Sequence, residues 1–266
     1  MVEFLPIGTR LVIEVLVPQL WNAWRTPLLA KANADALAVL QATDREFLEV
    51  VAEVHPRGPC EWLLRAAWVG NRDVVAWLGP GRRLHRAHAQ LAARGGHIDV
   101  LRWLRGRGCP WDEQTCEQAA AGGHLSLLQW ARARGCPWNE WTCEAAAAGG
   151  HLDVLQWARA RGCPWNRCTF FAAARHGDLV VLDFLRREAC PWDAWTCAGA
   201  AQGGHLHVLK WLRRHGCPWN ASTCKHAAYY GHARVLEWAI EQGCPQRDWM
   251  DEYAAETWTN PEFVFW

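Results

Sequence analysis

The chain has 266 residues, of which 51% are apolar, so its composition is that of a folded protein and excludes general disorder. Its 28 basic residues nearly balance its 27 acidic residues. No bulk field therefore draws the whole chain to nucleic acid or to an anionic membrane. The unusual features are twenty Trp and twelve Cys beside only two Met. So many Cys in one chain can indicate disulfides or zinc sites.

The beginning of the chain shows no secretory signal peptide, because Arg10 and Glu14 interrupt the first apolar stretch. The longest uncharged run, from Ala194 to Leu209, is too short to span a membrane and contains a Gly-Gly pair. We therefore expect an intracellular, cytoplasmic protein without a transmembrane segment.

Residues 1–58 follow no repeat, whereas residues 59–266 are predicted to be an array of repeats. Cys-Pro-Trp recurs every 27 residues, and Cys-Pro without Trp follows after one further interval, at Cys109, Cys136, Cys163, Cys190, Cys217 and Cys244. Ten of the twelve Cys lie in two columns of this repeat. We expect about seven units, the last one truncated. Residues 1–58 are predicted to form an N-terminal helical cap, because the end units of such arrays cover an otherwise exposed apolar face.

Each unit is predicted to form two short helices. A Trp before the N-cap and a Cys at the fourth helical position, as in Trp111 and Cys116, have the spacing of a hydrophobic staple. The small side chains of Cys116, Ala119 and Ala120 form a stripe that allows close helix contact. Gly122-Gly123 ends this first helix, and a Leu-rich second helix follows. The first helices begin after residues of the preferred N-cap types, which are Asp112, Asn139, Asn166, Asp193 and Asn220.

The run from Ala145 to Leu155 reads Ala-Ala, Gly-His and Val-Leu at the spacing of the ankyrin core, so the repeat resembles the ankyrin family. The unit is shorter than the 33-residue ankyrin repeat, and the missing residues fall between Gly135 and Trp141, where ankyrin repeats form a projecting β-hairpin. The Gly-Cys-Pro-Trp form is similar to short ankyrin-type repeats of large DNA viruses that infect amoebae. The resemblance implies an all-α helical repeat solenoid without long β-hairpins. It also implies a protein-binding or scaffolding role, with host interaction in the host cell cytoplasm.

Each unit offers two Cys and one His, such as Cys109, Cys116 and His124, which raises the alternatives of a zinc site or a disulfide. Zinc sites need four converging ligands, but the two Cys lie in different parts of the unit. Asn71 and Asp178 replace His in the third column. Because Asn and Asp are N-cap residues, we interpret the His column as the cap of the second helix and the Cys as buried thiols. No metal and no cofactor are predicted.

Catalysis is not expected either. Cys168 lies outside the two Cys columns and has His176 nearby in the sequence, but no strained turn or orienting group frames it as a nucleophile. The sequence contains no phosphate-binding Gly loop and no paired-carboxylate pattern. We therefore predict a protein that is not an enzyme.

Charge is distributed unevenly along the chain. Residues 82–107 contain seven Arg and one Asp, and residues 237–262 contain seven acidic residues and one Arg. The basic segment 82–107 and the acidic segment 237–262 could attract one another, which suggests head-to-tail self-association of two chains. A second hypothesis is nucleic-acid binding through residues 82–107. A further ladder of Arg could track phosphates, although cations in the last turn of a helix also complement its dipole, and we favour this second interpretation. The ladder consists of Arg105, Arg132, Arg159, Arg186 and Arg213.

Positions that differ between units are the better guide to binding, because stacking does not fix them. In ankyrin-like stacks the first helices line the concave face, so the resemblance implies that their variable side chains meet the target. Trp, Tyr and Arg are typical hot spots of interfaces. The alternative is that the Trp side chains only cover neighbouring repeats. The candidate protein-binding residues are Trp141, Phe171, Arg175, Trp195, Tyr229, Tyr230 and Trp249.

The function predicted from these patterns is binding of a protein target that the sequence does not identify, on the concave face of a solenoid. Leu5-Pro6, followed by Leu11, Val15, Leu16 and Trp24-Arg25, resembles a degenerate F-box. This resemblance implies an alternative, in which residues 1–58 make the chain a substrate adaptor of a ubiquitin ligase. Nucleic-acid binding through residues 82–107 is the third hypothesis.

Overall fold

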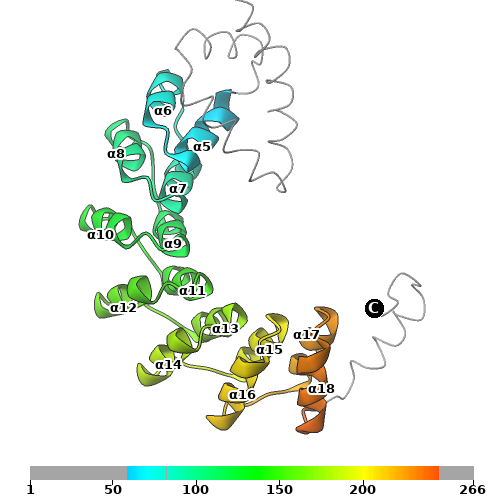
Figure 1. Ribbon diagram of the computed structural model, residues 1–266. Coiled ribbons are helices and arrows are strands. Elements are labelled where there is room, and N and C mark those ends of the chain that lie inside the picture. Colours follow the sequence, from blue (N-terminus) through cyan, green and yellow to red (C-terminus); the bar gives the residue numbers. More distant parts are fainter. Residues whose placement is uncertain (1–58, 82, 246–266) are drawn as a thin grey trace, which may run out of the picture. The chain divides into compact units, whose positions relative to one another are not determined.

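Short α-helices are the only secondary-structure elements in residues 59–81 and 83–245, the parts of the chain that the computed structural model describes (Figure 1). Neighbouring helices pack in series, which confirms the predicted all-α helical repeat fold. The predicted cap or F-box at residues 1–58 lies outside the described residues. The described chain divides into an N-terminal unit, residues 59–66 and 71–81, and an array, residues 67–70 and 83–245.

The N-terminal unit contains most of α5 (Pro59–Val69) and all of α6 (Arg72–Leu78). Asn71 is the N-cap of α6, and its side-chain oxygen accepts a hydrogen bond from the backbone N–H of Val74 at 3.1 Å. This bond satisfies one of the amide groups that have no partner inside the first turn of a helix. The column that holds His in most units therefore does hold a capping residue here.

The array consists of helix pairs, each with a first helix and a second helix (Figure 1). The first helices are α7 (Arg86–Arg94), α9 (Glu113–Ala121), α11 (Glu140–Ala148), α13 (Arg167–His176), α15 (Ala194–Gln202) and α17 (Ala221–Tyr229). The second helices are α8 (Ile98–Gly106), α10 (Leu125–Ala133), α12 (Leu152–Ala160), α14 (Leu179–Arg187), α16 (Leu206–Arg214) and α18 (Ala233–Glu241).

The first helices from α9 onward begin where the sequence predicts, directly after an Asp or Asn. In α15 the side-chain oxygen of Asp193 accepts a hydrogen bond from the N–H of Trp195 at 3.0 Å. Asn139 and Asn166 make the equivalent bonds in α11 and α13, at 3.1 Å and 2.8 Å. Because these bonds satisfy unpaired amides at the helix start, they fix where each first helix begins.

The first helices pack directly against one another and form a row, which we call the first-helix row (Figure 1). Cys116, Ala119 and Ala120 of α9 have no exposed surface, as the predicted stripe requires. Small side chains allow two helix backbones to approach closely. Each second helix contacts mainly the first helix of its own pair, and the second helices form the second-helix row.

Arg and Trp side chains fill the space between successive second helices, in a contact we call the Arg–Trp clamp. Arg105 of α8 stacks on Trp111 at 4.1 Å, and the Trp111 ring meets Trp130 of α10 edge-on at 5.9 Å. Arg105 also donates a hydrogen bond to the backbone oxygen of Cys109 at 2.6 Å. The same stacking occurs at 4.1 to 4.3 Å in the pairs Arg132–Trp138, Arg159–Trp165 and Arg213–Trp219.

The clamp adds to two interpretations made from the sequence. The Trp before each N-cap is predicted to staple the start of its own helix, and Trp111 also joins two second helices. Every Arg of the ladder lies in the last turn of its helix, as predicted, and four of the five also stack on a Trp. The ladder therefore holds successive units together, and each cation–π contact adds to their stacking.

Candidate protein-binding surface

The two candidate Trp residues of the first-helix row both occupy the second position of a helix. The N-cap bonds described above hold the backbone N–H of Trp141 and Trp195. Trp141 remains 53% exposed and Trp195 48% exposed. Large apolar side chains of this kind are costly to leave in contact with water, so these two positions distinguish α11 and α15 from the other first helices.

Three of the candidate residues, Trp195, Tyr229 and Tyr230, come together at α15 and α17. With His226 they form what we call the aromatic cluster. The Trp195 ring meets His226 edge-on at 5.9 Å, and His226 stacks on Tyr230 at 6.3 Å. Tyr229 meets Tyr230 at 5.1 Å and is 73% exposed. Gln202 donates a hydrogen bond to the Tyr230 hydroxyl oxygen at 2.9 Å. The contacts order these rings before any partner binds.

His226 is a member of the cluster that the sequence did not single out. Its Nδ1 lies 2.7 Å from the backbone oxygen of Ser222, one turn earlier in α17. That contact fixes the ring between Trp195 and Tyr230. The sequence did contain a signal for this contact, because His226 and Tyr230 lie four residues apart and residues at this spacing share a helix face.

The other candidates that the structure describes lie on α11 and α13. Phe171 on α13 is only half-buried, and its ring and backbone fit against Gly199, where an added Cβ would lie 2.8 Å from the Phe171 backbone oxygen. Phe171 therefore has a packing role between α13 and α15. Arg175 is exposed at the end of α13, and Trp141 lies on α11. Trp249 lies outside the described residues.

The α9 and α11 part of the first-helix row carries acidic side chains. Glu117 and Glu144 occupy equivalent positions and are half-buried. Burial raises the pKa of Glu117, and the charge of Glu144 raises it further. Burial also raises the pKa of Glu144, although the nearby Arg175 charge opposes this shift. The row therefore carries acidic side chains at α9 and α11 and the aromatic cluster at α15 and α17.

The thiols of the first Cys column bond to the preceding unit. The Cys136 thiol donates to the backbone oxygen of Asp112 at 3.5 Å, and the Cys163 thiol donates to Asn139 at 3.4 Å. Burial raises the pKa of Cys190 to about 12. Contact with the Cys136 thiol and burial together raise the pKa of Cys116. Protonated thiols of this kind are poor nucleophiles and poor metal ligands.

The His column occupies the N-cap position of the second helices, as predicted, but its side chains have a different role. His205 makes no side-chain cap bond to α16, and its Nε2 lies 3.1 Å from the backbone oxygen of Arg175 at the end of α13. His124 makes the same contact with Arg94 at 3.0 Å. Each His therefore links its unit to the preceding first helix. Among the described residues, no group of three or more His, Cys, Asp or Glu could hold a metal ion.

This role gives the array a pH dependence. Burial lowers the pKa of His97 and His205 below the ordinary value of 6.5. The charges of His176, His207 and His232 lower the pKa of His205 further, and that of His124 acts on His97. The folded state then binds fewer protons than the unfolded state. Stability from these groups is complete above the unfolded value and falls as the pH drops below it.

We expect the melting temperature to fall between about pH 7.5 and about pH 5.5, and to fall less in a His97→Asn, His205→Asn variant. Asn is chosen because Asn71 caps α6 at the same position. Glu117 and Glu144 oppose the effect through their raised pKa values, but equally in both proteins. Equal slopes of melting temperature against pH, measured by calorimetry, would contradict this assignment.

The basic run at residues 82–107 is partly engaged inside the array. Arg86 forms an ion pair with Asp112 at 3.2 Å, and Arg102 lies 5.7 Å from the Trp130 ring. Arg105 belongs to the Arg–Trp clamp, and Arg107 stacks on Trp103 at 5.0 Å. These contacts have structural roles and fix the directions in which the four cations point.

No family model matches the chain, and no curated protein sequence matches it. Among solved structures, it is similar to the crystal structure of the human ASB11 ankyrin repeat domain, with 14% sequence identity and a TM-score of 0.47. The match covers 59% of this chain and 84% of that chain. No helix in residues 59–81 and 83–245 is long and apolar enough to cross a membrane.

Proposed function

We propose that the chain is a protein-binding module whose target contacts the first-helix row, with the aromatic cluster at α15 and α17 as its main anchor. The observation that carries the proposal is the exposure of large aromatic side chains at positions that stacking does not determine, above all Trp195 and Tyr229. The resemblance to ankyrin repeats implies that this row lies on the concave face.

The order within the aromatic cluster supports a binding role. Tyr and Trp lose little conformational entropy on binding and bury a large area, so they dominate many interfaces. The ring contacts of His226 with Trp195 and Tyr230 reduce that cost further. Trp141 on α11 provides a second contact point, with the acidic Glu144 on the same helix.

The test is a Trp141→Ala, Trp195→Ala, Tyr229→Ala variant. Proximity labelling in the native cell identifies a partner of the wild type, which is then purified and titrated calorimetrically against both proteins. We expect the variant to bind at least about 30-fold more weakly, because losing a hot spot costs about 2 kcal/mol or more. The melting temperature should change by less than about 3 °C, because all three side chains are 48% exposed or more.

The matched control is Val180→Ala, which removes an exposed apolar side chain, 64% exposed, from α14 in the second-helix row. Its affinity for the partner should equal that of the wild type. Equal binding by the triple variant, or equal loss in the control, would contradict the proposed surface. A fall in melting temperature of more than about 5 °C would show that the Trp residues cover neighbouring units instead.

A further inference from the structure

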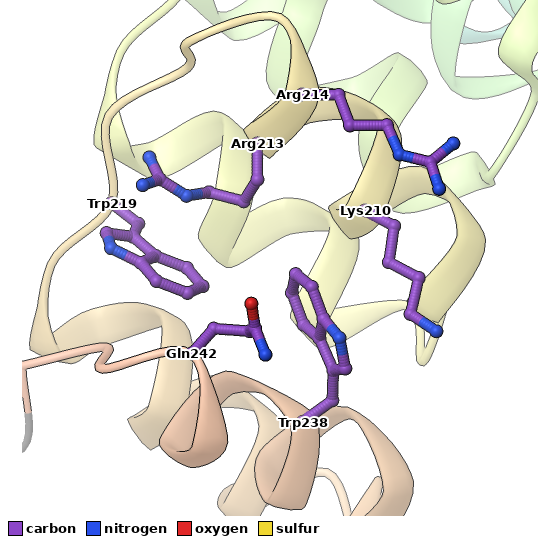
Figure 2. A pocket seen from close by; sticks show the side chains of 6 residues that line it. All are labelled: Lys210, Arg213, Arg214, Trp219, Trp238 and Gln242. Carbon is purple, nitrogen blue, oxygen red and sulfur yellow. The ribbon is translucent and has the colours of Figure 1, made fainter.

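One member of the Arg–Trp clamp differs from the others because it borders a pocket. A hollow of about 500 Å³ lies between α16 and α18 on the second-helix row. Its lining residues are Lys210, Arg213, Arg214, Trp219, Trp238 and Gln242 (Figure 2). Arg213 stacks on Trp219 at 4.2 Å, and the Trp219 ring meets Trp238 at 6.0 Å. Three cations and two indole rings therefore border one space.

The cations of this pocket are not matched by acids. Lys210 and Arg214 lie four residues apart on α16, where two like charges repel one another. In the part of the chain that the structure describes, no carboxylate forms an ion pair with either of them or with Arg213. The equivalent positions of α14 hold Asp183 and Arg187, which form an ion pair at 2.5 Å. The pocket thus has an uncompensated positive charge where another unit is neutral.

Contacts restrain the orientation of two of the three cations, Arg213 and Lys210. Arg213 donates a hydrogen bond to the backbone oxygen of Cys217 and also stacks on Trp219. Lys210 lies 5.7 Å from the centre of the Trp238 ring. Figure 2 shows Lys210 and Arg214 on the side of Trp238 that is opposite Trp219, with Gln242 lying between the two indoles. Ordered cations with unused N–H donors favour an anion that offers several oxygen atoms.

We propose that this pocket binds a phosphate monoester that carries an aromatic group. The phosphate oxygens accept hydrogen bonds from Lys210 and Arg214, because guanidinium and ammonium groups match phosphate in charge and geometry. The aromatic group contacts the indole walls, since the volume of the pocket is that of a small-molecule site and exceeds what one phosphate fills. A phosphotyrosine side chain and a nucleotide share this chemistry. The inference is independent of the target proposed for the first-helix row.

The test uses three probes in isothermal titration calorimetry of the full chain, which are O-phosphotyrosine, AMP and inorganic phosphate. Lys210→Asp reproduces the Asp–Arg pair of α14 and leaves the clamp residue Arg213 in place. We expect one organic phosphate to bind at least about tenfold more tightly than inorganic phosphate, and Lys210→Asp to weaken it at least about tenfold. Tighter binding of O-phosphotyrosine would identify the ligand as a phosphoprotein, and tighter binding of AMP would identify it as a nucleotide.

Arg187→Gln is the matched control, because it removes an exposed cation from the equivalent position of α14. It should leave the affinity unchanged. The proposal is wrong if no probe shows saturable binding, if Lys210→Asp binds as the wild type does, or if Arg187→Gln weakens binding equally. It is also wrong about the aromatic group if inorganic phosphate binds as tightly as both organic probes. Circular dichroism and melting curves show whether Lys210→Asp is folded, and Arg214→Gln provides a second variant.

Discussion

A Gly203→Ala variant should lose about 2–3 kcal/mol of stability although only one methyl group is added. Gly203 ends α15, and a Cβ there would lie 2.3 Å from the backbone oxygen of Arg175 in the preceding unit. It would also lie 2.5 Å from the His205 ring, which contacts that same oxygen. Because a backbone atom cannot move aside alone, α13 and α15 must separate. The melting temperature should fall by about 5–10 °C.

Gly106→Ala is the control for this prediction. Gly106 is the last residue of α8, and a Cβ there would meet no atom within 4 Å. The substitution should raise stability by up to about 1 kcal/mol, because Gly is a poorer helix former than Ala. Chemical denaturation of both variants checks the pair. A loss below about 1 kcal/mol in Gly203→Ala would show that the units separate without much cost.

A Phe170→Cys variant should lose about 2–4 kcal/mol although it makes the repeat more regular. Phe170 occupies the second Cys column in α13 and has no exposed surface. Its ring lies 5.2 Å from that of Trp192. Replacing a buried Phe by a smaller side chain removes hydrophobic contact and leaves a cavity. Substitution toward a consensus often stabilises a protein, so the expected sign here is opposite to the consensus rule.

Cys168→Ala, in the same helix, is the control, because it makes a side chain smaller at an exposed position instead of a buried one. Cys168 is exposed, so its change should alter the free energy of unfolding by no more than about 0.5 kcal/mol. Urea denaturation followed by circular dichroism measures both variants. Equal stability of Phe170→Cys and the wild type would contradict the prediction.

The helices of the array were predictable from the sequence because their signals are local. N-cap residues such as Asn166 and Asp193, and the terminating Gly203, act within a few residues of the helix end. The buried stripe of Cys116 and Ala120 follows from helical periodicity. The exposed Trp195 and Tyr229 were found because they interrupt the repeat. Their role in binding stays a prediction.

The roles that were not predictable depend on contacts between units. Nothing near Trp111 in the sequence indicates that Arg105 stacks on it, because the alternative staple with Cys116 has equally good spacing. His205 is in a cap position, yet its partner is the Arg175 backbone oxygen, which only the stacking of α15 on α13 brings close. The pocket at α16 and α18 likewise arises from the packing of two units.

The thiol bonds of the first Cys column join residues that lie close together in the sequence. The bonds of Cys136, Cys163 and Cys217 each reach back 24 residues, to the unit that precedes them. Chains whose contacts join nearby residues have a low contact order and close only short loops when they fold, so they fold fast. Folding can then start at any adjacent pair of units and spread in both directions. Removal of one whole 27-residue period would preserve every such separation, and the shorter chain should fold at a similar rate.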